Sequence, residues 1–446
     1  MLALKIIFGI VSCLSYLTLM TTMIILERDK PKNIIIWSIV FLLTQYVGYV
    51  IYLLIRHVFY KKRNSFSIKQ KEDEIYEDLI SNQLNDNKTK CEHEVFNFNS
   101  LAFNTHTTSN NSFEFIHDYE EMKESLIEDI KSAKKYIFLE LTKINTKDFQ
   151  DIKDVLIEKA SENVTVKFVH ERMLNFRLVK EMKTAGIKVY RFSKFNTIGK
   201  VYANLRNAIT IDGEIVYIAN LNVSNRQLKS SKETSSSFIK LKGDIVQDVD
   251  IQTRKDTIFA SGKYIPYQKL EESQYNNNNL IQFVANNANT DLELAIIKAI
   301  CMAKKSIQLQ LSQFIPTESI KSLLRFAINS DIQVRLMVPL KNDMHGKYFA
   351  SRAYSKELAL FGANVYLFDG YINFNAITID DEYVILGSYI VDREHLNTSP
   401  QSMFFIKDSK AVKNFNDKFN DGINNSYRIS NAKYMLVQEK FFKNFV

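Results

Sequence analysis

The hexapeptide Asn207-Ala208-Ile209-Thr210-Ile211-Asp212 recurs without change as Asn375-Ala376-Ile377-Thr378-Ile379-Asp380. Its isoleucine- and threonine-rich centre is typical of a strand, and a turn pair, Gly213-Glu214 or Asp381-Glu382, follows each copy. Both copies close a similar series of elements, so a chance match of this length at equivalent points is very improbable. The hexapeptide therefore marks an internal repeat, and this repeat decides the fold.

Upstream of each hexapeptide, the same elements are predicted in the same order. Helices over 121–131 and 291–299 lead into the strands that begin with Ala133-Lys134-Lys135 and Ala303-Lys304-Lys305. A second helix, a β-branched strand (164–170 or 332–338), a third helix and another strand (187–192 or 364–368) follow. Strands that alternate with helices predict an α/β fold, here two tandem repeats forming a pseudo-twofold, bilobal domain.

The predicted domain boundaries follow from this pattern. The first repeat is expected over 112–267 and the second over 280–446, joined by a connector at 268–279 that ends in four asparagines. Residues 64–111 are polar and only weakly periodic, and they are predicted to be a linker with one amphipathic helix over 72–84.

The N-terminal residues 1–63 predict a two-helix transmembrane hairpin. Residues 6–26 and 34–55 carry no charged side chain, and each run is long enough to cross ~30 Å of hydrocarbon at ~1.5 Å per residue. The first run is too long for a cleaved signal peptide. Two buried core helices are the alternative. Arg56, Lys61, Lys62 and Arg63 after the second run favour a cytoplasmic main domain.

Composition narrows the functional classes. Three cysteines exclude a disulfide framework, and no Cys/His cluster has zinc-ligand spacing, so neither a metal nor a cofactor is expected. The net charge of +8 fits contact with anionic lipid or with nucleic acid. Phosphate-handling enzymes commonly use Gly and His in their sites, and this chain has only 12 Gly and 7 His among 446 residues.

The chain resembles the bacterial cardiolipin synthases of the phospholipase D superfamily over nearly its whole length. The resemblance rests on Ile211-Asp212-Gly213-Glu214, Gly243-Asp244, Phe314-Ile315-Pro316, Val338-Pro339 and Ile379-Asp380-Asp381-Glu382. It implies two copies of the motif H-x-K-x4-D. In the family, one His attacks phosphorus, the other protonates the leaving alkoxide, and the Lys residues hold phosphate. This route moves a phosphatidyl group between two phosphatidylglycerols and releases glycerol.

At the motif positions, this chain lacks the residues that the resemblance calls for. Leu205 and Asn373 occupy the His places, and Asn207 and Asn375 occupy the Lys places. The motif's Asp is kept as Asp212 and Asp380. The small residue that follows is Ala219 or Gly387, and the family's Asn is kept as Asn222 but replaced by Ile390. Leu and Asn cannot attack phosphorus. We therefore predict a catalytically degenerate pocket in which Asp212 and Asp380, without a cation, repel a phosphodiester.

Three hypotheses follow for the function. The first is a degenerate membrane protein that binds anionic phospholipid, or that forms a homo- or hetero-oligomer with an active synthase, at the bacterial cell membrane. The second is an active phosphatidyltransferase with a rebuilt site that uses His170, His345 and Lys347, which follow predicted strands. The third is a nucleic-acid-binding member, which the membrane hairpin disfavours.

Overall fold

The computed structural model describes residues 2–27, 31–55, 93–171, 175–192, 204–218, 234–235, 238–267, 275, 279–286, 292–341, 345–372, 374–392, 396, 399–429 and 437–445. The chain divides into two compact units. Unit 1 holds residues 1–78 with 445, and unit 2 holds residues 79–444 with 446.

Unit 1 contains the predicted hairpin. Helix α1 (Leu2–Leu26) and helix α2 (Pro31–Thr44) lie on the two apolar runs, and residues 46–55 continue as helix. Met23, Phe41 and Tyr52 form the small buried core of this unit. Within the described residues, no helix has the length and apolar character required to cross a membrane.

The first repeat forms a seven-stranded mixed sheet in the order β2-β9-β7-β6-β3-β4-β5. Its strands β3, β4 and β5 are parallel, and β6 returns antiparallel to β3. The strands are β2 (Asn111–Ile116), β3 (Tyr136–Leu141), β4 (Thr165–His170), β5 (Lys188–Arg191), β6 (Ala208–Ile211), β7 (Ile215–Ile218) and β9 (Phe238–Gly243). The helices are α5 (Tyr119–Ser132), α6 (Gln150–Ser161), α7 (Phe176–Thr184) and α9 (Ile245–Ser261).

The second repeat forms a nine-stranded sheet in the order β1-β10-β19-β17-β16-β11-β13-β14-β20. The strands are β1 (Thr107–Thr108), β10 (Leu280–Ala285), β11 (Ser306–Gln310), β13 (Gln333–Pro339), β14 (Asn364–Phe368), β16 (Asn375–Ile379), β17 (Tyr383–Gly387), β19 (Ser402–Lys407) and β20 (Ser426–Arg428). The helices are α10 (Glu293–Met302), α11 (Glu318–Asn329), α12 (His345–Leu360), α14 (Ser409–Asn424) and α15 (Val437–Phe445).

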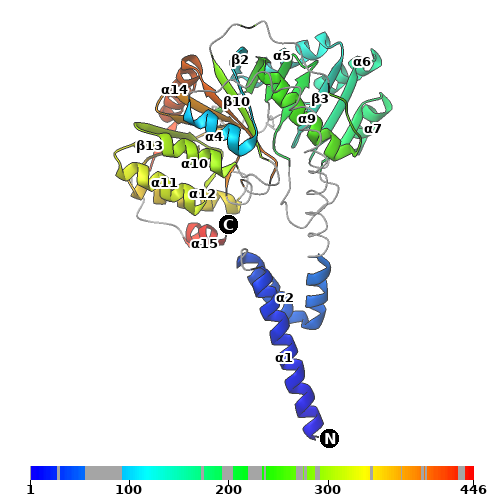
Figure 1. The fold of residues 1–446 in the computed structure, drawn as a ribbon, viewed down its shortest axis with the longest axis vertical. Helices are drawn as coiled ribbons and strands as arrows, with labels where there is room; N and C mark the ends of the chain where they lie inside the picture. The colour runs from blue at the N-terminus through cyan, green and yellow to red at the C-terminus, as the bar shows by residue number, and fades with distance from the viewer. Residues whose placement is uncertain are drawn as a thin grey trace. The chain divides into compact units, whose positions relative to one another are not determined.

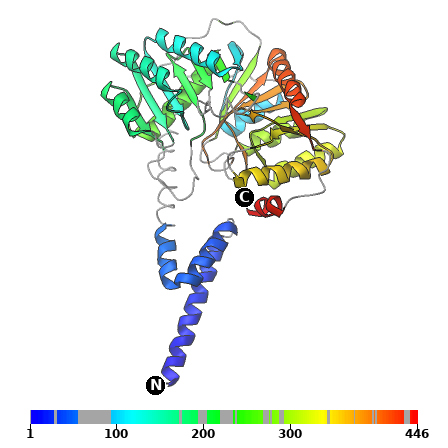
Figure 2. The ribbon, with the colours of Figure 1, turned by 180° about the vertical axis from the view of Figure 1, so that it is seen from behind.

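The two sheets share one topology. The order β10-β19-β17-β16-β11-β13-β14 repeats β2-β9-β7-β6-β3-β4-β5 strand for strand. The register also matches, since Ile137 pairs with Ile211 in the first sheet and Ile307 pairs with Ile379 in the second. Helices flank the strands of both repeats, as Figure 1 and Figure 2 show from opposite sides. An α/β fold of two tandem repeats is thus confirmed.

Each repeat has its own apolar core, and a further core joins the two. Alternate residues of β3, such as Ile137 and Leu139, point toward α5, α6 and α7. The opposite face contributes Val216 and Ile239 to a cluster that also contains Val384 and Phe404 of the second sheet, with residues of α9 and α14. The repeats therefore pack as one body in unit 2.

The linker predicted over 64–111 is wrong for its last part. Helix α4 (Glu94–Phe103) lies there, and its Val95, Phe96 and Phe103 are buried in the core of the second repeat. Strand β1 then pairs with β10 of that same repeat before β2 begins the first sheet. Asparagines among these apolar residues weaken the helical pattern, so the sequence did not predict this helix. The predicted helix 72–84 and most of the connector 268–279 lie outside the described residues.

Candidate functional site

The hexapeptide strands β6 and β16 begin at the edge of each sheet where β3 and β4, or β11 and β13, end. This placement follows from the antiparallel pairing of β6 with β3 and of β16 with β11. At this edge the repeats touch, because the Leu205 N–H donates to the Pro400 carbonyl over 2.9 Å. Leu205 precedes β6, and Pro400 precedes β19 of the second sheet. The candidate site is thus the edge at which the equivalent strands meet.

The two positions predicted from the motif to hold Lys are occupied by matched structural asparagines. Asn207 Oδ1 accepts the Thr142 N–H at 2.8 Å, and its Nδ2 donates to the Leu205 carbonyl at 3.0 Å. Asn375 Oδ1 accepts the Ser312 N–H at 2.7 Å, and its Nδ2 donates to the Tyr389 carbonyl. Both side chains are buried. Each amide therefore ties the start of its strand to the loop after the central strand.

The motif's two aspartates, Asp212 and Asp380, do not lie beside Asn207 and Asn375 at the site edge. The prediction that they repel a phosphodiester there is therefore wrong. Asp212 and Asp380 follow the far ends of β6 and β16, about 16 Å along an extended strand from Asn207 and Asn375. The Asp212 carboxylate accepts the N–H groups of Lys134, Lys135 and Tyr136 at 2.6, 2.8 and 2.8 Å.

Asp380 makes the same contacts in the second repeat. Its carboxylate accepts the N–H groups of Lys304, Lys305 and Ser306 at 2.7, 2.7 and 2.8 Å. Both aspartates have positive φ, 54° and 53°, and the residue after each, Gly213 or Asp381, does too. This pattern makes a type I′ hairpin turn. The aspartates thus fasten the helix-to-strand loop to the hairpin turn.

The remaining motif positions are described only in part. Leu205 is half-buried, whereas Asn373, Ala219 and Asn222 lie outside the described residues. Packing requires a glycine at position 387, because a Cβ there would collide with the Ser402 carbonyl oxygen of the neighbouring strand. Ile390 contributes its N–H, which donates to Gln401 Oε1 at 2.5 Å.

A buried polar network beside the site was missed by the sequence analysis. Asn204 Nδ2 donates to Glu140 Oε1, and the Asn204 N–H donates to Glu171 Oε2 at 3.0 Å. Arg206 forms an ion pair with Asp256 and donates from Nη2 to the Asn286 carbonyl at 2.8 Å. Asn286 precedes the second repeat's α10, so Arg206 joins the repeats.

This network is richer in carboxyl groups than in cations. Burial raises the pKa of Glu140 well above its usual range, and the neighbouring Asp256 raises it further, while Arg206 acts in the opposite direction. These surroundings favour the protonated form of Glu140. A neutral Glu140 leaves Arg206 to compensate Asp256, which keeps the ion pair balanced.

Of the three residues proposed for a rebuilt site, the structure describes the side chains of His170 and Lys347. His170 is buried at the end of β4, with its ring 5.8 Å from that of Phe168. Lys347 Nζ donates to Asp392 Oδ2 at 3.0 Å, and the same oxygen accepts Gln313 Nε2 at 2.6 Å. His345 is the first residue of α12, and its side chain lies outside the described part of the structure.

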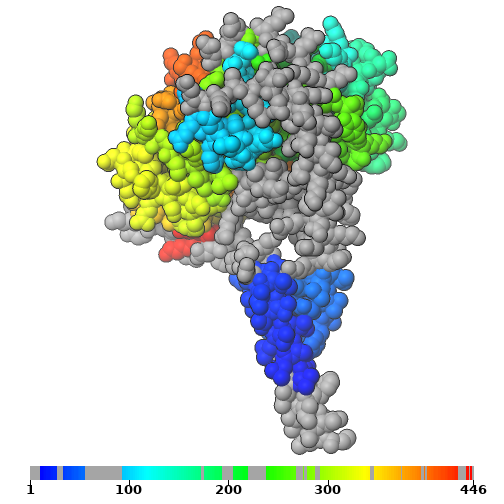
Figure 3. All heavy atoms as spheres, viewed as in Figure 1, coloured from blue at the N-terminus to red at the C-terminus, as the bar shows by residue number. Residues whose placement is uncertain are grey.

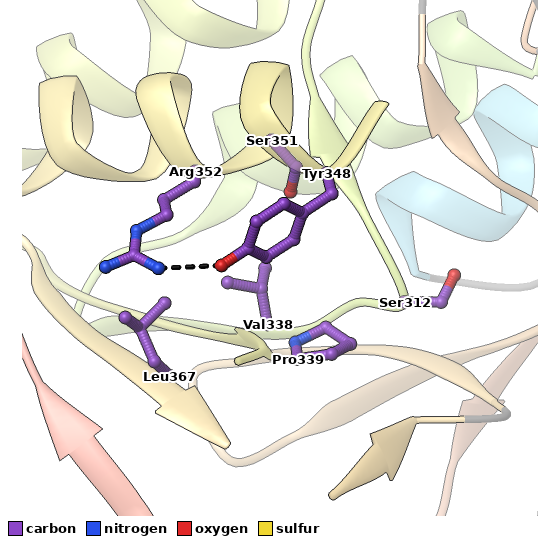
Figure 4. A pocket seen from close by; sticks show the side chains of 7 residues that line it. All are labelled: Ser312, Val338, Pro339, Tyr348, Ser351, Arg352 and Leu367. Carbon is purple, nitrogen blue, oxygen red and sulfur yellow. Dashed lines mark hydrogen bonds between the residues drawn. The ribbon is translucent and has the colours of Figure 1, made fainter. Parts of the chain in front are cut away.

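A small hollow lies next to the site in the second repeat, between α12 and the ends of β13 and β14. Its lining includes Val338, Pro339 and Leu367, and Arg352 Nη1 donates to the Tyr348 hydroxyl across it at 2.7 Å (Figure 4). Ser312 and Ser351 complete the lining. The lining contains neither a carboxylate nor an imidazole. Among the described residues, no group of three His, Cys, Asp or Glu side chains has metal-binding geometry.

Comparison with known proteins identifies relatives of the chain. Residues 296–422 match the family model for "Cardiolipin synthase, PLD-like domain". The major cardiolipin synthase ClsA of Bacillus subtilis (strain 168) is 28% identical over 443 residues, which cover 92% of this chain and 91% of that protein. The cardiolipin synthase of Oceanobacillus iheyensis is 26% identical, with 96% and 95% covered.

A solved structure supports the same fold. Phosphatidylserine synthase of Haemophilus influenzae superposes with a TM-score of 0.58 at 12% identity, covering 79% of this chain and 97% of that one. The sequence matches extend along almost the whole chain, and they agree with the fold, in which the two sheets share one topology. Over almost its whole length the chain is similar to bacterial cardiolipin synthases, and part of its second repeat matches the model of the cardiolipin synthase, PLD-like domain.

Proposed function

We propose that this chain is a family member without phosphatidyltransferase activity, and that it acts at the membrane through binding. The observation that carries the proposal is the matched use of Asn207 and Asn375. Both stand at the Lys places, both are buried, and both spend their amides on backbone hydrogen bonds. A side chain held in this way has no charge to offer a phosphate.

The first repeat's His place also lacks a nucleophile, and its surroundings lack free positive charge for a phosphate. Leu205 at a His place has no lone pair to attack phosphorus. Near it, Arg206 is paired with Asp256, while Glu140 and Glu171 accept hydrogen bonds from Asn204. Phosphoryl transfer depends on positive groups placed against the phosphate oxygens, and the Arg206 guanidinium is already paired with a carboxylate.

We propose that the hairpin of unit 1 inserts into the lipid bilayer. Most of the exposed large apolar side chains among the described residues lie on it, for example Leu14, Leu17, Leu42, Leu43 and Leu54. The two helices are also joined by polar contacts, since the Tyr46 hydroxyl lies 2.9 and 2.8 Å from those of Ser12 and Ser15. An apolar exterior and hydrogen bonds between the helices fit a hydrocarbon surround. The bacterial cell membrane with the main domain cytoplasmic remains our assignment.

The binding role calls for a partner at that membrane. We propose anionic phospholipid, and an active synthase in a shared oligomer, because the two-repeat scaffold is kept intact without the reactive side chains. The scaffold's inter-repeat contacts, such as Leu205 to Pro400 and Arg206 to Asn286, hold the site edge together.

The test is cardiolipin formation by the purified full chain in phosphatidylglycerol vesicles. We expect no cardiolipin and no released glycerol, with the Bacillus subtilis relative as the active control. Turnover by this chain would overturn the proposal, provided that the preparation contains no other synthase.

The rebuilt-site alternative has one observation in its favour, since His170 lies at the same edge as Leu205. Against it, the Lys347 ammonium is already paired with Asp392. If turnover is found, His170→Gln and His345→Gln separate the cases, because a rebuilt site requires at least one of them.

A further inference from the structure

The outward surface of the second repeat carries an unusual row of side chains on α4, α10 and α11. Helix α10 packs against both of the other helices, and the space-filling view shows all three on one face (Figure 3). Leu101 is 89% exposed, Leu294 45% and Phe326 68%. Cys301 is also exposed. We name these four residues, with Lys298, the α10 face.

The first repeat provides an internal reference for this surface. Ala133-Lys134-Lys135 and Ala303-Lys304-Lys305 align α5 with α10, and Ile152-Lys153 and Ile320-Lys321 align α6 with α11. The residues at the matching positions are Glu124, Glu128, Lys131 and Glu158 in the first repeat, and Leu294, Lys298, Cys301 and Phe326 in the second, and all of them are exposed except the partly buried Lys298.

At these matched positions, acidic side chains of the first repeat are replaced in the second repeat by apolar or basic side chains. Three glutamates of the first repeat are replaced by Leu294, Lys298 and Phe326. Both surfaces belong to helices of the same topology, so the shared fold does not require apolar residues at these points. An exposed Phe and Leu are not needed for packing, since Ile296, Ile300 and Leu324 already fill the core beneath them.

Cations border the apolar residues. Lys304 and Lys305 follow the end of α10, are exposed, and form no salt bridge within the described residues. The pKa of Glu94 is lowered by the nearby Lys298, with which it pairs, and more weakly by Lys304. Glu94 therefore neutralises Lys298, and Lys304 and Lys305 remain as exposed cations at the end of α10.

We propose that the α10 face docks on the surface of an anionic phospholipid bilayer. Isolated Leu and Phe side chains with Lys at their border match the chemistry of interfacial membrane contact, in which apolar groups enter the acyl boundary and Lys meets the headgroups. A second protein chain would more often meet a continuous apolar patch. This inference adds a second membrane contact to the proposed hairpin anchor, on which it rests for proximity to the bilayer.

Cys301 makes the test direct. A variant of the full chain with Cys13→Ser and Cys91→Ser is labelled at Cys301 with an environment-sensitive fluorophore and reconstituted in phosphatidylglycerol vesicles. We expect a blue shift and quenching by lipids that carry a nitroxide near the headgroup. The matched control places the label on the first repeat through Lys131→Cys, with Cys301→Ser, and it should show neither effect.

Further arms identify the source of the signal. Leu294→Glu with Phe326→Glu, which introduces the first-repeat residues at exposed positions, should abolish the quenching. Vesicles of phosphatidylcholine should reduce it several-fold, as should high salt.

Absence of quenching at Cys301, in chains that still float with the vesicles, would overturn the inference and leave the hairpin anchor standing. A blue shift without quenching that rises with protein concentration would also overturn it, in favour of a second copy. A chain that does not float would refute the anchor itself.

Discussion

The two hairpin-turn aspartates allow a quantitative test of how the repeats are built. Each carboxylate accepts three backbone N–H groups, and Asp→Ala removes all three bonds. The three bonds of Asp212 are half-buried, whereas two of those of Asp380 are exposed to water. At about 1.5 kcal/mol for a half-buried bond to a charged group and less for an exposed one, Asp212→Ala should cost about 4–5 kcal/mol and Asp380→Ala about 2–3 kcal/mol.

Backbone strain adds to both losses, because Ala at positive φ costs about 1 kcal/mol. Asp381→Ala is the matched control. It has the same strain at φ 57° but only one exposed hydrogen bond, from Asn416 Nδ2. Asp212→Gly removes the strain and keeps the lost bonds, so it should recover about 1 kcal/mol.

The assay is urea unfolding of the purified full chain in detergent, followed by circular dichroism. The order of loss should be Asp212→Ala, then Asp380→Ala, then Asp381→Ala. The reasoning fails if Asp212→Ala unfolds at the urea concentration of the Asp381→Ala control. It also fails if either substitution removes a lipid-dependent activity while leaving stability unchanged, because the aspartates would then serve a site.

Three further predictions follow from the site itself. Asn207→Leu should lower the free energy of unfolding by about 2–4 kcal/mol, because two hydrogen bonds of the amide are lost. The loss should be about 1 kcal/mol larger than for Asn375→Leu, because Asn207 alone of the two has positive φ. Thermal melts of both variants check the difference. The raised pKa of Glu140 means that the folded state binds the extra proton, so stability falls as pH rises above the pKa of the unfolded state, about 4.3. Glu140→Gln should flatten this dependence and be relatively more stable than the unmodified chain at pH 8. Equal slopes of stability against pH in melts of the two proteins from pH 5 to 8 would contradict this prediction. Arg206→Met should cost about 3–5 kcal/mol by leaving Asp256 uncompensated, and Arg206→Met with Asp256→Leu should recover most of that loss in the same melts.

The repeat was predictable because hydrophobic periodicity and an identical hexapeptide are both present in the chain. Strand β14 falls on the predicted range 364–368, α5 extends slightly beyond the predicted helix at both ends, and α10 begins and ends a few residues later than predicted. Helix α4 was not predictable in this way. Its buried Val95, Phe96 and Phe103 are separated by asparagines and pack against a repeat that lies almost two hundred residues later in the chain.

The roles of the motif residues show a different limit. Spacing assigned Asn207 and Asn375 to equivalent positions, and each ties the start of its strand to the loop after the central strand, but spacing also suggested that Asp212 and Asp380 share that pocket. Residue order along a strand fixes the side to which a side chain points, while the length of the strand fixes how far away it lies. The Arg206–Asp256 pair joins residues 50 apart in sequence, and only tertiary packing brings it together.

The central claim is that this chain has no nucleophile for a phosphatidyl group, and it is tested most directly by looking for the covalent intermediate. The purified full chain is incubated with phosphatidylglycerol labelled in its phosphate, quenched in alkali and examined for protein-bound label, with the Bacillus subtilis relative as the positive control. We predict label on the relative and none on this chain. Label on this chain that is lost in His170→Gln or His345→Gln would contradict the claim.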